Sequence, residues 1–207
     1  MTRKHESTET RQQQIVDAAR RVIIKYGSER VTVKRITHEV GISEAAVYRH
    51  FKSKKQILSL LAEQVGDTLM GDIARATVRG RTPLKTLESA LRSHLSAIEQ
   101  RRGVSFQVVA EIVSLGDKRL NREMSRSIDN YISRIANLLS RAVKSGEVRE
   151  DIDTGVAATV LFGMIQGLVT IWALGNYGFD LRQRYVSVWH IFREAVAKQE
   201  SRLNPAS

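Results

Sequence analysis

Three side chains that recognise nucleic acids well stand in consecutive positions at Tyr48, Arg49 and His50, and three lysines follow within the next five residues. A guanidinium donates two parallel hydrogen bonds to guanine or to a phosphate, and an ammonium group neutralises a phosphate as a point charge. A phenol and an imidazole can also donate to phosphate oxygens. The chemistry of this segment is therefore recognition of a polyanion.

The charge of the chain is concentrated in the same region. The net charge of the 207 residues is +11, and residues 1 to 60 hold 13 Lys and Arg against 6 Asp and Glu, which gives +7. The remaining residues, with 20 against 16, carry +4. This asymmetry indicates that the N-terminal part binds a polyanion, and nucleic acid fits it better than a membrane surface does.

Composition and motifs argue against catalysis and metal binding. The chain has no cysteine, which excludes disulfides, thiolate nucleophiles and cysteine-based zinc sites. Its five histidines are scattered, without an HExxH motif, a Gly-rich phosphate loop or a GxSxG elbow. We predict that the protein is not an enzyme and uses neither cofactor nor metal. The polar N-terminus MTRKHESTETRQQQ lacks the apolar segment of a secretory signal, so we expect a cytoplasmic location.

Helical periodicity recurs along almost the whole chain, which predicts an all-α fold. Apolar residues from Ile15 to Tyr26 form one stripe of a helix that begins at about Thr10 and ends at Gly27. Two short helices follow, the second over 33–40 and the third from 44 to about 51. Thr32 and Ser43 are suitable N-caps for them, and the short Gly41-Ile42 connector makes them cross steeply.

Longer helices are expected after this N-terminal group. The first of them begins at Lys54 and runs to about Arg79, and the others cover 83–100, 104–115, 118–145, 154–174 and 181–198. We expect a flexible arm over 1–9, a three-helix domain over 10–55 and a larger helical domain over 56–207.

A short helix, a tight turn and a second short helix with a cationic outer face describe a helix-turn-helix DNA reader. Val47 and Phe51 should face the core, so the opposite face of the third helix is left for DNA. Arg49 is suited to guanine, the two alanines to close approach and thymine methyl groups, and Lys54 to a phosphate. The predicted DNA-binding residues are Thr32, Lys34, Ser43, Ala45, Ala46, Tyr48, Arg49, His50, Lys52 and Lys54.

Residues from about Arg11 to Leu61 resemble the DNA-binding domain of the TetR (tetracycline repressor) family of bacterial transcription regulators. The resemblance rests on Tyr26-Gly27, Val31-Thr32-Val33, Gly41-Ile42-Ser43, the segment from Val47 to Phe51 and Lys54 with Ile57-Leu58. It implies a homodimeric repressor that binds a palindromic operator through the helix-turn-helix DNA-binding domain over 10–55. It also implies that the larger domain over 56–207 serves dimerisation and effector binding, and that a small molecule bound there releases the operator. Glu44 is an acidic residue on the face of the third helix that is expected to contact DNA. It either complements the helix dipole or accepts a hydrogen bond from a cytosine amine.

The segment from Thr154 to Phe179 has 26 consecutive uncharged residues, which is long enough to span a membrane. Its polar residues and the lack of a flanking Lys or Arg cluster favour a helix buried in the domain and in a subunit interface instead. We therefore predict no membrane association. The predicted dimer interface contains Gly163, Gly167, Tyr185, Val188, Trp189 and Phe192.

An effector cavity in the larger domain should be mostly apolar, which suits a hydrophobic or amphiphilic small molecule. Aromatic residues and methionine at helical spacing are also ordinary core residues, and that alternative stays open for every candidate. The candidate ligand-binding residues are Phe106, Val109, Ile112, Met124, Tyr131, Leu168 and Trp172.

Overall fold

The computed structural model describes residues 7–77 and 82–198, and within these ranges the protein is helical without a strand. The all-α prediction is confirmed. The helices are α1 (Thr8–Tyr26), α2 (Val33–Val40), α3 (Glu44–His50), α4 (Lys54–Thr77), α5 (Pro83–Gln100), α6 (Val104–Leu115), α7 (Lys118–Lys144), α8 (Thr154–Leu174) and α9 (Leu181–Val196), with a short 3₁₀ turn, η1 (Ser28–Arg30).

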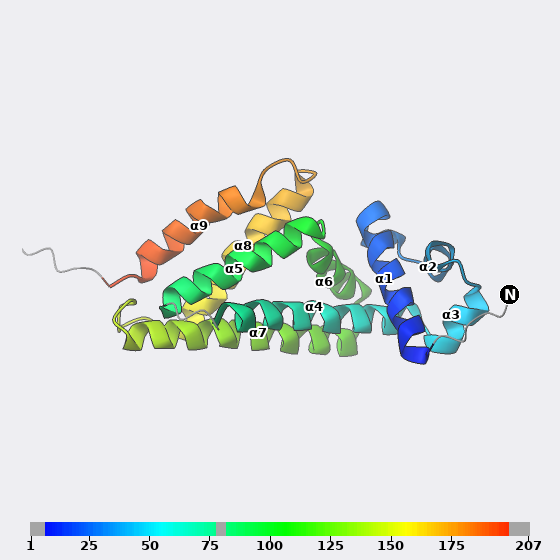
Figure 1. Cartoon of the computed structure of the whole chain (residues 1–207), viewed down its shortest axis with the longest axis horizontal. Coiled ribbons are helices and arrows are strands. Elements are labelled where there is room, and N and C mark those ends of the chain that lie inside the picture. The colour runs from blue at the N-terminus through cyan, green and yellow to red at the C-terminus, as the bar shows by residue number, and fades with distance from the viewer. Residues whose placement is uncertain (1–6, 78–81, 199–207) are drawn as a thin grey trace, which may run out of the picture. The chain divides into compact units, whose positions relative to one another are not determined.

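The chain forms two compact units (Figure 1). The first unit contains Met1–Asp67 and Gln100–Ser127, and the second contains Thr68–Glu99 and Ile128–Ser207. Helices α4 and α7 therefore contribute residues to both units. The predicted boundary after residue 55 separates a DNA-binding from an effector-binding domain, whereas the compact units are defined by contacts between residues. The functional boundary stays a prediction. Most of the predicted arm, residues 1–6, lies outside the described residues.

In the first unit, α1 packs on both helices of the helix-turn-helix. Its apolar stripe is buried from Ile15 to Ile23, as the sequence pattern predicts, but Tyr26 at the end of the predicted stripe is 52% exposed. Ile36 from α2 and Val47 from α3 are equally inaccessible, so each short helix buries one apolar face against α1. Burial of side chains of this size contributes about 1.5–3 kcal/mol each. This core, rather than the propensity of seven- and eight-residue helices, stabilises α2 and α3.

Local capping and one glycine set the geometry of the helix-turn-helix. The hydroxyls of Thr32 and Ser43 accept hydrogen bonds from the N–H groups of Arg35 and Ala46, each at 3.2 Å. Gly41 has the left-handed conformation (φ 76°), and its N–H donates to the Thr37 carbonyl at 2.8 Å, which ends α2. A side chain at Gly41 would be strained in this conformation. The turn between α2 and α3 is therefore encoded locally.

Replacing Ser43 with alanine should lower the free energy of unfolding by about 1 kcal/mol, because a first-turn N–H of α3 loses its acceptor. Urea unfolding followed by circular dichroism measures this change. Ser133, which is exposed within α7, supplies the control, since its replacement by alanine removes a hydroxyl but no cap. Equal unfolding midpoints for the two variants would contradict the capping role.

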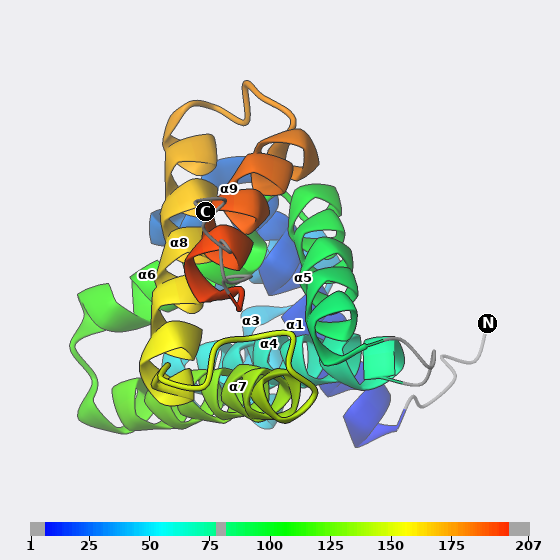
Figure 2. The same cartoon turned by 90° about the vertical axis from the view of Figure 1, so that its left-hand side faces the viewer.

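In the second unit, α8 and α9 lie side by side (Figures 1 and 2). Leu161 and Ile165 from α8 and Tyr185 and Phe192 from α9 are buried. The Tyr185 hydroxyl donates a hydrogen bond to the Glu88 carbonyl of α5 at 3.4 Å, and burial raises the pKa of this phenol. The aromatic residues of α9 thus belong to the core of the unit.

Helix α8 is long and apolar enough to cross a membrane by length and composition, with a mean hydropathy of 1.8 over its most apolar window. The core helix of a soluble protein passes the same test. Residues on one side of α8, such as Ala158, Leu161 and Val169, are fully buried in the second unit. Asp153 caps its first turn by accepting from the N–H groups of Gly155 and Val156. Of the most apolar window of α8, 39% is buried, so one side of the helix packs in the second unit and the other side is exposed.

Candidate nucleic-acid interface

Helix α3 divides sharply into a buried and an exposed face. Val47 is 0% exposed and Phe51, the residue that ends the helix, is 4% exposed, whereas the intervening Tyr48 is 50% exposed. Arg49 is also exposed. A large aromatic side chain on the surface has no packing role there. The face that carries Tyr48 and Arg49 is therefore available to a partner.

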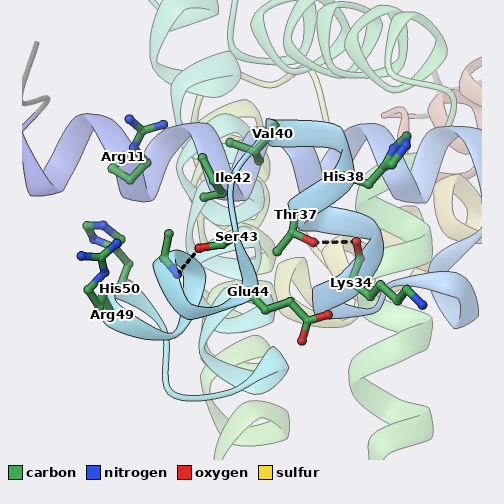
Figure 3. Close-up of a pocket in the computed structure, with 12 residues that line it drawn as sticks. Arg11, Lys34, Thr37, His38, Val40, Ile42, Ser43, Glu44, Arg49 and His50 are labelled. Carbon is green, nitrogen blue, oxygen red and sulfur yellow. Dashed lines mark hydrogen bonds between the residues drawn. The ribbon is translucent and has the colours of Figure 1, made fainter. Parts of the chain in front are cut away.

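An open hollow lies beside this face and is lined by α1, α2, α3 and the turn between α2 and α3. Figure 3 shows Arg49 and His50 close together at one end of the hollow, and Arg11 of α1 also lines it. Lys34 and Glu44 also line it. Basic residues from two helices that are far apart in sequence thus line the same hollow. This arrangement suits the phosphates on either side of a groove.

His50 also supplies an unused polar atom. Its Nδ1 is buried and has no hydrogen-bond partner among the described residues. Ring nitrogens that are buried normally find a partner, and none of the described residues supplies one for this atom. The Thr37 hydroxyl, which belongs to another lining residue of the hollow, is occupied, since it donates to the Lys34 carbonyl at 2.7 Å (Figure 3).

The remaining predicted DNA-binding residues lie around the same surface, with one difference. Thr32, Lys34, Ala45 and Lys52 are exposed, and Ala46 is half-buried beside the hollow. Lys54 is held instead in an ion pair, with its Nζ 2.7 Å from Glu111 Oε1. A phosphate contact by Lys54 would require this pair to open.

Two basic residues that line the hollow, Arg11 and His38, are absent from the predicted set. Arg11 lies on α1, more than thirty residues before α3, and its guanidinium donates to Gln14 Oε1 at 2.8 Å. His38 is exposed on α2. The packing of α1 across the helix-turn-helix brings Arg11 there, and no local spacing in the sequence indicates it.

Acidic groups around α2 are neutralised by neighbouring cations. Glu39 accepts from Arg21 Nε at 2.9 Å and from Lys25 Nζ at 3.1 Å. These two hydrogen bonds, that from Arg21 foremost, lower the pKa of Glu39. Glu44 is exposed in the first turn of α3, where a carboxylate complements the helix dipole. The surface around the hollow therefore stays predominantly positive.

The candidate effector residues are distributed over both units. Phe106, Val109, Ile112 and Met124 belong to the first unit, and Tyr131, Leu168 and Trp172 belong to the second. The Tyr131 ring lies 5.7 Å from that of His94 and 6.0 Å from that of Phe162. The indole N–H of Trp172 donates to the Phe179 carbonyl at 3.0 Å, which holds the segment between α8 and α9. The assignment of these residues to a ligand stays a prediction.

The candidate interface residues fall into two groups. Gly163 and Gly167 are exposed, with open space where a side chain would stand. Tyr185, Trp189 and Phe192 are buried in the second unit, and Val188 is half-buried. The four α9 residues therefore pack inside the second unit, whereas the two glycines of α8 lie on its surface, where a partner could contact them.

Within the described ranges, no group of three or more His, Asp or Glu side chains is placed to hold a metal ion. The arrangement around α3 offers hydrogen-bond donors, positive charge and a narrow helix face. These groups can bind a nucleic acid, and they can do so by contacts to both backbone and bases.

Comparison with known proteins agrees with this chemistry. Residues 15–61 match the family described as bacterial regulatory proteins, tetR family, and residues 61–195 match the C-terminal region of YsiA-like proteins. A fatty acid metabolism regulator protein of Bacillus subtilis is 27% identical over 173 residues, which covers 81% of this chain and 86% of that protein. The nucleoid occlusion factor SlmA of Actinobacillus pleuropneumoniae is 24% identical and covers 90% of this chain and 93% of that protein.

The fold has close counterparts among solved structures. The transcriptional regulator FadR from Bacillus subtilis, solved in complex with stearoyl-CoA, superimposes with a TM-score of 0.78 at 24% identity and covers 89% of this chain and 98% of that chain. The helix-turn-helix in the N-terminal match and the helical C-terminal match together span most of the sequence. The chain belongs to the tetR family of bacterial regulatory proteins and is a DNA-binding transcriptional regulator.

Proposed function

We propose that the protein is a repressor that binds a palindromic operator as a homodimer and leaves it when a hydrophobic effector binds. The observation that carries the DNA-binding part is the face of α3, on which Tyr48 and Arg49 are exposed while Val47 is fully buried. Arg49 reads a guanine in the major groove, and the surrounding cations bind phosphates. The regulator works in the cytoplasm, where the chromosome is accessible to it.

An exposed apolar stripe on α8 supports the homodimer. Val156, Val160, Gly163, Gly167, Ile171 and Leu174 recur along one side of the helix and are all exposed. Ile171 is 62% and Leu174 80% exposed, which is unusual for two large aliphatic residues on one helix face. The glycines allow a second helix to approach closely. A self-complementary stripe of this kind suits a two-fold axis, and a two-fold dimer reads a palindromic site.

The effector class is proposed to be a fatty-acyl thioester. The support comes from relatives, because one is a fatty acid metabolism regulator and a similar fold has been solved with stearoyl-CoA. A largely apolar helical domain can enclose an acyl chain, and a few polar groups suffice to orient its headgroup. The bound effector favours a conformation in which the two copies of α3 no longer match successive major grooves.

Effector and DNA should oppose each other reciprocally. If stearoyl-CoA at saturation raises the operator dissociation constant by a given factor, saturating operator must raise the stearoyl-CoA dissociation constant by the same factor. Typical coupling of about 1–3 kcal/mol corresponds to a 5- to 150-fold change. Fluorescence anisotropy of labelled operator measures the operator dissociation constant, and isothermal titration calorimetry measures the stearoyl-CoA dissociation constant.

Free CoA and free stearate serve as controls that separate headgroup from acyl-chain binding. Tight stearoyl-CoA binding without any change in operator affinity would contradict the release mechanism, since a ligand shifts an equilibrium only by its differential affinity for the two states. Absence of stearoyl-CoA binding together with selective operator binding would contradict the effector class and leave the DNA-binding role in place.

A further inference from the structure

Three polar contacts tie the beginning of α4 to α6 and α7 within the first unit. We call these six residues the α4 clasp. Its contacts join Lys54 Nζ to Glu111 Oε1 at 2.7 Å, Lys55 Nζ to Asp117 Oδ2 at 2.7 Å and Ser59 Oγ to Glu123 Oε2 at 2.9 Å. One residue of each pair comes from the first two turns of α4, directly after the recognition helix.

Glu111 is the most buried member of the clasp. It is 8% exposed and is the only charged residue in the α6 sequence VSFQVVAEIVSL. A buried carboxylate that loses its cation costs several kcal/mol, because neither water nor another charge replaces the lost partner. Transfer of Lys54 from Glu111 to a DNA phosphate would incur that cost. The burial of Glu111 therefore favours a Lys54 that stays paired.

Asp117 strengthens the same junction from the start of α7. Its Oδ1 accepts from the backbone N–H groups of Arg119 and Leu120 at 3.0 and 3.1 Å, so it caps α7 while its other oxygen binds Lys55. The hydrogen bond from Lys55, followed by that from Leu120, lowers the pKa of Asp117 to about 2. Asp117 therefore carries a negative charge opposite Lys55 at neutral pH.

The clasp lies close in sequence to the DNA-reading residues. Only three residues separate His50, the last residue of α3, from Lys54. Phe51 is buried among them, and the N–H of Lys52 donates to Gln56 Oε1 at 2.6 Å, which holds the connection against α4. A displacement of Lys54 therefore displaces the C-terminal end of α3 as well, because the connection between them is short and held against α4.

We propose that Lys54 and Glu111 are positioning residues: their ion pair persists on DNA and sets the orientation of α3 against the duplex. This inference rests on the proposed operator-binding function. It assigns Lys54 a role different from the phosphate contact that the sequence predicts. Lys52, which is exposed, remains a phosphate-binding candidate and makes a matched comparison two residues away.

The test measures operator and scrambled-duplex affinity of Lys54→Met, Glu111→Gln, the double variant Lys54→Met/Glu111→Met and Lys52→Met across a range of salt concentrations. Each change at Lys54 or Glu111 alone should weaken operator binding about tenfold, with a smaller loss on scrambled DNA. The double variant should also lose about tenfold rather than about a hundredfold, because the two residues act as one unit. None of the three should change the salt slope, whereas Lys52→Met should lower its magnitude by about 1.8, because each of the two subunits loses one phosphate contact worth about 0.9.

Urea unfolding tests whether each variant is folded. The double variant provides a folded control even if the single variants are unstable, since an apolar pair often replaces a buried ion pair without loss of stability. A salt slope lowered by Lys54→Met as much as by Lys52→Met, or tighter operator binding by Glu111→Gln, would overturn the inference and make Lys54 a phosphate contact. Lack of operator preference in the wild-type protein would instead overturn the proposed function, on which the inference depends.

Discussion

Replacing Arg49 with alanine is expected to weaken operator binding by about 1–3 kcal/mol and to relax sequence preference at one position in each half-site. Arg49 is exposed on α3, lines the hollow and has Val47 and Phe51 as the buried anchors of its helix, so its removal should leave the fold intact. Anisotropy titrations against the operator and a set of single-base variants measure both effects.

The control for this experiment is Arg141→Ala, which removes the same charge from an exposed position on α7 in the second unit. It should change neither the affinity nor the base preference. A uniform loss of affinity on all sequences for Arg49→Ala, with a shallower salt slope, would show that Arg49 binds a phosphate instead of a base.

Replacing Ile171 with glutamate should convert the protein from dimer to monomer at micromolar concentration. A two-fold interface along α8 would bury both introduced carboxylates without partners, and we expect the dimer dissociation constant to rise at least a hundredfold, about 3 kcal/mol. Operator affinity should fall in parallel, because a monomer reaches only one half-site. Sedimentation equilibrium measures the first effect and anisotropy the second.

Val113→Glu is the matched control, since Val113 is 66% exposed on α6 and close to Ile171 in exposure at 62%. Val113→Glu should unfold at nearly the wild-type urea concentration, whereas Ile171→Glu should unfold at a lower one, because the monomer loses the stability that dimerisation contributes. Both variants should keep the wild-type helical circular dichroism before urea is added, because neither side chain is part of a core. A dimeric Ile171→Glu protein would contradict the α8 interface, and a monomeric wild-type protein would contradict the homodimer itself.

The sequence is informative about the helices because their ends are marked by local chemistry. Thr32, Gly41, Ser43 and Asp153 cap or end helices in the structure through contacts within four residues along the chain. Where no such residue marks an end, the prediction is less accurate: α9 ends at Val196, two residues before the expected end. The beginning of α1 at Thr8 depends on the Ser7 cap, which the apolar stripe does not indicate.

The site is less predictable because its parts come from distant segments. The periodicity of α3 separates Tyr48 from Val47, and the structure has the first exposed and the second buried. The ion pair between Lys54 and Glu111 could not be predicted in this way, because Glu111 lies 57 residues further along the chain and no local sequence pattern connects the two residues. Similarly, the apolar side of α9 is evident from the sequence, but only packing shows that Trp189 is buried in its own unit.

The most direct test of the central claim is fluorescence anisotropy of the purified protein with the intergenic DNA upstream of its own gene and with a scrambled duplex, at several salt concentrations and without detergent. The account predicts a soluble dimer that prefers the upstream DNA by about a thousandfold or more, with affinity that falls steeply as salt rises. Equal affinity for the two duplexes at every salt concentration would contradict sequence-specific regulation through α3.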